Sequence, residues 1–286
     1  MAASILRKGV TSNGITWRVL GGSASSTKNS LPLIMVHGFA CSGDDWGALP
    51  KMLAAKREVC IFDQRGLNDS KCPPGPCTIA DLANDVNEIY TQNEYDKAHL
   101  MGISMGGMIT QEFAVQRPSK VSSLILGATT HGGREATHPP AEFLNLCGDW
   151  VKSDLDCNRT QREIAEEFIR HCTPPDFEKR PGGTVFFRKL VDGFLNTSRT
   201  SDGLLAQLKA LAKFNSTKVL DSIHAPTLVV HGTNDTVVPY PNGVSLANRI
   251  PNADLLEWET AGHFFWLHKP VEYVEFLHEF LRKNDE

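Results

Sequence analysis

The chain has 286 residues, of which 41% are hydrophobic and 22% are charged, and its formal net charge at pH 7 is −4. This composition excludes a disordered or fibrous chain, and the length allows a full hydrophobic core. The negative charge and the lack of a basic run argue against nucleic acid or an anionic membrane as the main partner, so we expect a small-molecule partner.

Strands and helices are expected to alternate along most of the chain. Residues 4–9 and 14–20 predict an antiparallel hairpin, because Asn13-Gly14 favours the positive φ of a tight turn. Further apolar runs predict buried strands at 31–36, 59–62, 98–101, 121–126, 226–230 and 253–258. Helical patterns lie at 44–55, 79–92, 105–116, 240–249 and after Pro270. This alternation predicts an α/β fold, a mostly parallel twisted sheet with helices on both faces.

One long insert breaks the alternation. Between strands 121–126 and 226–230 the sequence has several amphipathic helical patterns and no convincing strand. We therefore expect a helical cap at residues 131–215, between a first core segment at 1–130 and a second at 216–286. Most of its aromatic side chains are expected to form its own core.

A serine lies where a strand turns into a helix. The segment Gly102-Ile103-Ser104-Met105-Gly106 follows strand 98–101 and leads into helix 105–116. Such a turn strains the serine backbone and requires small neighbours, which predicts Ser104 as a nucleophile. A serine hydroxyl also needs a base and a group that orients the base.

A histidine and an aspartate follow the last two strands. His263 lies after strand 253–258, and Asp235 follows strand 226–230. Both are expected at the carboxyl edge of the sheet, where open α/β sheets place their sites. This predicts a triad in which Asp235 accepts the Nδ1 proton of His263. Asp63 also ends a strand, but we expect it to brace a turn by pairing with Arg65.

The backbone N–H groups of Phe39 and Met105 are the expected oxyanion donors. His37, which precedes them, is expected to be a structural hydrogen-bonding residue. The candidates for the walls of a substrate pocket are Trp46, Trp150, Phe187 and Phe264.

With these motifs in place, the chain resembles the α/β-hydrolase family. The resemblance is carried by His37-Gly38, Asp63 to Gly66, Gly102 to Gly107, His231 to Asp235 and Gly262-His263. Ser104 to Met108 and Pro74-Gly75-Pro76 are similar to the enol-lactonase and methylesterase branch. Asn68 departs from the family's turn, which commonly has glycine there. Asparagine tolerates positive φ, so we expect the turn to persist.

The sequence therefore predicts a serine esterase, lipase-like in character, that cleaves an ester, thioester or lactone of a small to medium, mostly hydrophobic substrate through an acyl-enzyme. No metal or other cofactor is expected. Acyl transfer or C–C bond hydrolysis on the same triad, and a slow-turnover ligand receptor, remain open alternatives. The oligomeric state is not indicated.

The expected cellular location and the expected state of the cysteines rest on motifs that the sequence does not contain. No apolar run reaches the ~20 residues of a membrane span, and residues 1–13 do not resemble a secretory signal, so we expect a cytoplasmic protein. The seven cysteines show no C-x-x-C pair, which predicts reduced thiols. A bridge between Cys72 and Cys77 is the minor alternative.

Overall fold

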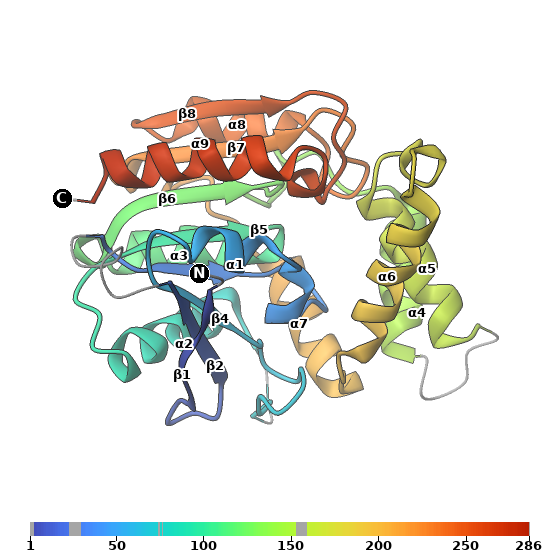
Figure 1. Cartoon of the computed structure of the whole chain (residues 1–286), viewed down its shortest axis with the longest axis horizontal. Coiled ribbons are helices and arrows are strands. Elements are labelled where there is room, and N and C mark those ends of the chain that lie inside the picture. The colour runs from blue at the N-terminus through green and yellow to red at the C-terminus, as the bar shows by residue number, and fades with distance from the viewer. Residues whose placement is uncertain (1–2, 23–29, 74, 76, 153–158, 286) are drawn as a thin grey trace.

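The computed structural model describes residues 3–22, 30–73, 75, 77–152 and 159–285 (Figure 1). These residues form one eight-stranded sheet with the order β1-β2-β4-β3-β5-β6-β7-β8. The pairs β1–β2 and β2–β4 are antiparallel, and the other neighbouring strands are parallel. The strands are β1 Ser4–Val10, β2 Thr16–Gly21, β3 Leu33–Val36, β4 Val59–Phe62, β5 Ala98–Ile103, β6 Val121–Gly127, β7 Thr227–Gly232 and β8 Ala253–Trp258.

Helices cover both faces of this sheet, which confirms the expected fold class. The short α1, Leu49–Leu53, packs against α9, Pro270–Lys283, on one face. On the other face lie α2, Ile79–Gln92, α3, Met105–Gln116, and α8, Pro241–Arg249 (Figure 1). Because both faces are covered, every residue of β3, β4, β5 and β6 is buried.

The expected N-terminal hairpin is present. Gly14 adopts φ +89° in the turn between β1 and β2, as the Asn-Gly pair predicts.

The prediction of a single helix at 44–55 is wrong. A short 3₁₀ helix, Gly43–Trp46, is separated from α1 by Gly47, whose φ of 62° and ψ of −124° are not helical. The helical spacing of apolar residues continues through this break, so the pattern does not reveal it.

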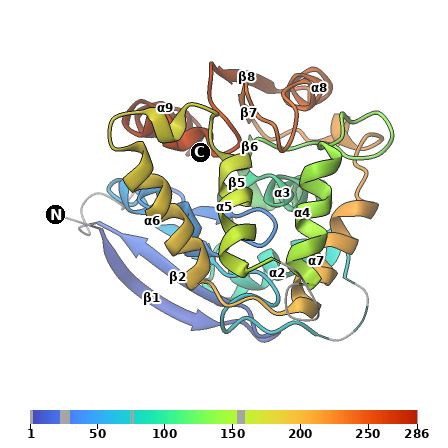
Figure 2. The ribbon, with the colours of Figure 1, turned by 90° about the vertical axis from the view of Figure 1, so that its right-hand side faces the viewer.

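In the part of the chain that the structure describes, four α-helices between β6 and β7 stand in front of the carboxyl edge of the sheet (Figure 2). They are α4 Ala141–Lys152, α5 Gln161–Cys172, α6 Gly183–Asn196 and α7 Ser201–Lys213. Phe168 of α5 stacks on Phe194 of α6 with centroids 4.9 Å apart, and Trp150 meets Phe194 edge-on at 4.9 Å. An aromatic core thus joins α4, α5 and α6. The boundaries of this cap at residues 131 and 215 stay a proposal.

Two further observations concern the residues that the structure describes. None of their helices is long and apolar enough to cross a membrane. Their cysteines, including Cys72 and Cys77, are all free, so no bridge joins those two.

Candidate active site

Ser104 occupies the turn between β5 and α3 in a strained conformation, with φ 55° and ψ −122°. Residues other than glycine rarely adopt this region. Two glycines allow the backbone to pass here: a Cβ on Gly102 would lie 2.2 Å from the Gly106 carbonyl oxygen, and a Cβ on Gly106 would lie 2.0 Å from that of Val36. Gly102 and Gly106 therefore allow the turn that carries Ser104 to pack closely against the end of β3.

His263 and Asp235 meet across the loops that follow β8 and β7. The His263 Nδ1 lies 2.8 Å from Asp235 Oδ2. The other oxygen, Asp235 Oδ1, accepts the N–H groups of Val237 and Val238, each at 2.8 Å. Because an ionised carboxylate only accepts hydrogen bonds, the proton is on Nδ1, and Nε2 of His263 is left as an acceptor.

A second histidine contacts the same carboxylate. His231 Nε2 donates to the Val238 carbonyl at 2.8 Å and lies 3.4 Å from Asp235 Oδ2. Burial raises the pKa of Asp235, but attraction to His263 and the hydrogen bonds of His231 and His263 outweigh burial and lower this pKa to about 2. Asp235 is thus an ionised carboxylate at neutral pH. The sequence reasoning did not foresee the contact of His231.

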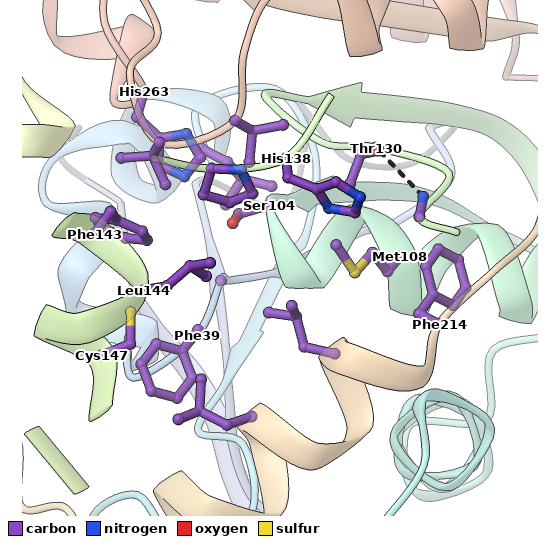
Figure 3. A pocket seen from close by; sticks show the side chains of 18 of the residues that line it. Phe39, Ser104, Met108, Thr130, His138, Phe143, Leu144, Cys147, Phe214 and His263 are labelled. Atoms are coloured by element: carbon purple, nitrogen blue, oxygen red, sulfur yellow. Dashed lines mark hydrogen bonds between the residues drawn. The ribbon is translucent and has the colours of Figure 1, made fainter. Parts of the chain in front are cut away.

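Ser104 and His263 line one cavity of about 460 Å³ (Figure 3). Within the described part of the chain, no hydrogen bond joins the Ser104 hydroxyl to the His263 ring. Proton transfer between them would require the two side chains to approach when a substrate binds, as is common in ligand-free sites.

Among the described residues, no hydrogen-bond acceptor is found for the backbone N–H groups of Phe39 and Met105, the two expected oxyanion donors, nor for that of Gly106 in the first turn of α3. The neighbours of Phe39 differ: Gly38 N donates to His37 Nδ1 at 2.7 Å, and Ala40 N donates to Gln207 Oε1 at 3.0 Å. Met105 begins α3, where the helix dipole favours negative charge.

His37 is a buried neutral residue in this structure. Burial, followed by the charge of His263, lowers the pKa of His37 to about 3. Its ring packs on Trp46 with centroids 4.4 Å apart. These contacts agree with a structural assignment.

Of the four residues expected in the pocket walls, only Phe264 lines the cavity. Trp46 instead fills the core between His37 and Trp266. Trp150 belongs to the aromatic core of the cap, and Phe187 lies under the guanidinium of Arg170 at 5.1 Å. The lining residues that the sequence reasoning missed include Met108, Phe143, Leu144, Cys147, Leu208, Leu211 and Phe214.

Charged side chains are absent from the cavity lining in the described part of the chain. The polar lining groups are hydroxyls and imidazoles, those of His37, Ser104, Thr130, Thr137, His138 and His263. Nor do the described residues contain three His, Cys, Asp or Glu side chains gathered as metal ligands. The cavity thus suits an uncharged, largely apolar ligand.

Asp63 braces a turn, but through partners other than the expected Arg65. Its Oδ1 accepts the Gly43 N–H at 2.8 Å, and its Oδ2 accepts the Asn68 side chain at 3.0 Å. Arg65 pairs with Asp85 of α2 at 2.6 Å, so the expected Asp63–Arg65 pair is wrong. Asn68 has φ 48°, and the turn persists as expected.

Comparisons with known proteins agree with this architecture. A family model described as the alpha/beta hydrolase fold matches residues 32–270. A proline iminopeptidase of Clostridium botulinum is 26% identical to this chain. The alignment is 294 residues long and covers 94% of this chain and 94% of that protein. A hydrolase structure from Pseudomonas aeruginosa PA01 has 25% identity and a TM-score of 0.79, covering 96% of this chain and 97% of that one. The enol-lactonase structure from Burkholderia xenovorans LB400 has 20% identity and a TM-score of 0.81, covering 96% and 100% of the respective chains, and shows a common fold.

Proposed function

The chain belongs to the α/β-hydrolase family, and from this premise we propose that it is a serine hydrolase that cleaves carboxylic esters, thioesters or lactones through an acyl-enzyme on Ser104. Asp235 and His263 complete the proposed triad, and the N–H groups of Phe39 and Met105 form the proposed oxyanion hole. The observation that carries the proposal is the strained Ser104, which shares a cavity with an imidazole held by a buried carboxylate.

The proposed reaction has two acyl-transfer steps. Ser104 Oγ attacks the carbonyl carbon while His263 Nε2 takes the hydroxyl proton, and the negative charge on the former carbonyl oxygen is stabilised by the two N–H groups. Collapse breaks the bond to the leaving alcohol or thiol, which receives the proton from His263. Water then gives a proton to His263 and attacks the acyl-enzyme, so that the acid is released and Ser104 is restored.

The proposed substrate is uncharged and mostly hydrophobic. The cavity volume of about 460 Å³ lies in the range of small-molecule sites. Phe143, Leu144 and Phe214 contribute apolar walls, and no lining residue in the described part of the chain offers a counter-ion for a carboxylate or an amine. Burying such a charge without a partner would cost several kcal/mol.

A fluorophosphonate probe tests the assignment, because it phosphonylates a serine only where a base activates it. The wild type should be labelled, Ser104→Ala should lose the label, and His263→Ala should label more slowly by two or more orders of magnitude. His138→Ala is the matched control, since His138 lines the same cavity but has no hydrogen bond to an acid among the residues described by the structure. It should label at nearly the wild-type rate.

Two results would contradict the proposal. Labelling that persists in Ser104→Ala would place the nucleophile elsewhere. A wild type that is not labelled although circular dichroism shows it folded would favour the alternative of a ligand receptor. Product analysis with a p-nitrophenyl ester, with and without added alcohol, separates hydrolysis from acyl transfer.

A further inference from the structure

Arg199 is a half-buried residue in the segment between α6 and α7, and its guanidinium is turned inward: Nη2 is buried and has no hydrogen-bond acceptor among the described residues. Its Nε donates to the Ala40 carbonyl at 2.7 Å, and its Nη1 donates to the carbonyls of Phe194 and Thr197 at 2.7 and 2.8 Å. The guanidinium also lies 3.8 Å from the ring centroid of Phe194. In the described part of the chain no carboxylate forms an ion pair with it, and Asp45 acts on it only through space. A buried cation without a paired anion is costly and calls for an explanation.

The carbonyl that Nε contacts belongs to the loop of the proposed oxyanion hole. The Ala40 carbonyl and the Cys41 N–H are two ends of one peptide group, and this N–H donates to the Gly38 carbonyl at 3.3 Å. The Gly38 carbonyl and the Phe39 N–H are likewise two ends of one peptide group. In a trans peptide these ends point in opposite directions. Two hydrogen-bonded peptides therefore connect the Arg199 guanidinium to the Phe39 N–H.

Ala40 itself is strained and held from both sides. Its φ is 60°, and it is fully buried. Its N–H donates to Gln207 Oε1 of α7 at 3.0 Å, and Gln207 Nε2 donates to the Arg65 carbonyl at 3.0 Å. A strained residue keeps its conformation only where its surroundings impose it. Here Gln207 holds the N–H and Arg199 holds the carbonyl of the same residue.

Attachment of the cap does not by itself account for these contacts. Other hydrogen bonds already join the segment before Arg199 to the core: Thr197 Oγ1 lies 2.9 Å from Ser42 Oγ, and Ser198 exchanges two hydrogen bonds with Asn68, at 2.8 and 3.0 Å. None of these needs a buried charge. The position of the guanidinium at Ala40 is explained if its charge acts on the loop.

We propose that Arg199 and Gln207 are positioning residues of the oxyanion hole. They fix the loop 38–41, and the charge of Arg199 polarises the two peptides so that the Phe39 N–H becomes a stronger donor to a developing oxyanion. The inference rests on the proposed function and adds that residues following α6 prepare the site for the transition state.

Kinetics and transition-state binding of substituted proteins test this inference. Arg199→Met should lower kcat for p-nitrophenyl butyrate at least 10-fold with KM within about 3-fold of the wild type, because the effect is confined to the oxyanion. The inhibition constant of butaneboronic acid, which forms a tetrahedral adduct on a serine, should rise by the same factor. Arg199→Lys, which keeps the charge, should fall between Arg199→Met and the wild type, and Gln207→Met should also lower kcat.

Arg170→Met is the matched control, since Arg170 lies over Phe187 in the same group of helices but contacts no residue of the loop 38–41. It should leave kcat and boronate affinity unchanged. A folded Arg199→Met with wild-type kcat, or with a raised KM alone, overturns the inference. If Arg199→Met does not fold, Arg199→Lys and Gln207→Met are judged by the same criteria.

Failure of the proposed function would look different from failure of the inference alone. A wild type and an Arg170→Met that neither turn over the ester nor bind the boronate would overturn both. A wild type that does both while Arg199→Met, or its two replacements, does so equally well would overturn only the inference.

Discussion

At the scale of single residues, the Asp235 carboxylate is surrounded by donors. It accepts the N–H groups of Val237 and Val238 and contacts His263 and His231. Burial raises the pKa of Asp235, but the interactions with His263 and His231 outweigh it and favour the ionised form. A carboxylate in this state couples protein stability to pH.

Asp235 should contribute to stability against acid. Its folded-state pKa of about 2 lies below the ordinary aspartate pKa of 3.8, so its stabilising contribution is complete above about pH 4 and is lost as the pH falls toward 2. Between about pH 6 and about pH 2.5 the wild type should lose on the order of 1 to 2 kcal/mol of unfolding free energy that Asp235→Asn does not lose. Urea unfolding at several pH values measures this difference.

The control for this experiment is Asp254→Asn, which changes an exposed aspartate of β8. Its acid profile should follow that of the wild type. Parallel profiles for the wild type and Asp235→Asn would show that the hydrogen bonds of Asp235 do not bias its ionisation.

Residue positions relative to strand ends were predictable, whereas partners across the fold were not. Ser104, Asp235 and His263 each follow a strand, and parallel strands end at the same edge, so sequence order sufficed to expect them together. Arg65 instead pairs with Asp85 of α2, while the two oxygens of Asp63 accept hydrogen bonds from Gly43 and Asn68. The local sequence around Arg65 does not show which aspartate it pairs with in the folded protein.

At the scale of elements, the break between the 3₁₀ helix Gly43–Trp46 and α1 depends on one backbone conformation. Gly47 has φ 62° and ψ −124°, and a Cβ placed there would meet no atom within 4 Å. The cost of any side chain at this position is therefore conformational rather than steric contact with neighbours.

Gly47→Ala should lower the free energy of unfolding by about 1 to 3 kcal/mol, since alanine is strained in this conformation. Gly193→Ala in α6 is the matched control: a Cβ there also meets nothing within 4 Å, but the backbone is helical. It should raise the free energy of unfolding by about 0.5 to 1 kcal/mol. Chemical denaturation measures both, and a Gly47→Ala protein as stable as the wild type would contradict the argument.

The helices of the cap were predictable, but the direction of their side chains was not. Helical spacing identifies the buried side of α4 and α6, yet a cap helix has two buried directions, one toward its neighbouring helices and one toward the cavity. Trp150 and Phe187 face helices or an arginine of the cap, whereas Phe143 of the same α4 lines the cavity. Arg199 and Gln207 escaped notice for the same reason, because their partners are set only when the cap meets the core.

At the scale of the whole molecule, the cap and the carboxyl edge of the sheet together enclose a cavity that has no charged side chain among its described lining residues. Leu144 and Phe143 come from α4, Leu208 and Leu211 come from α7, and Ser104 comes from the core. The selection of substrates by charge therefore depends on residues of both the cap helices and the core.

Two p-nitrophenyl esters of equal shape should differ widely in rate. The succinate monoester has the same heavy-atom skeleton as the 4-methylpentanoate but ends in a carboxylate. We expect its kcat/KM to be at least 100-fold lower, because the lining residues that the structure describes offer that charge no counter-ion. Initial rates at neutral pH compare the two esters, and similar values would mean that the acyl group does not enter this cavity.

The contacts at Ala40 also bear on how such a protein can diversify. Helices α4 and α5 contribute Phe143, Leu144, Cys147 and Phe168 to the cavity, and these side chains can be exchanged to admit other acyl groups without a change at the reacting atoms. Arg199 and Gln207, in the stretch from Thr197 to Gln207, cannot be exchanged in this way, because both side chains form hydrogen bonds with the backbone of Ala40. Selection for new substrates would thus change the sequence of α4 and α5, whereas Arg199 and Gln207 would stay nearly constant among related proteins.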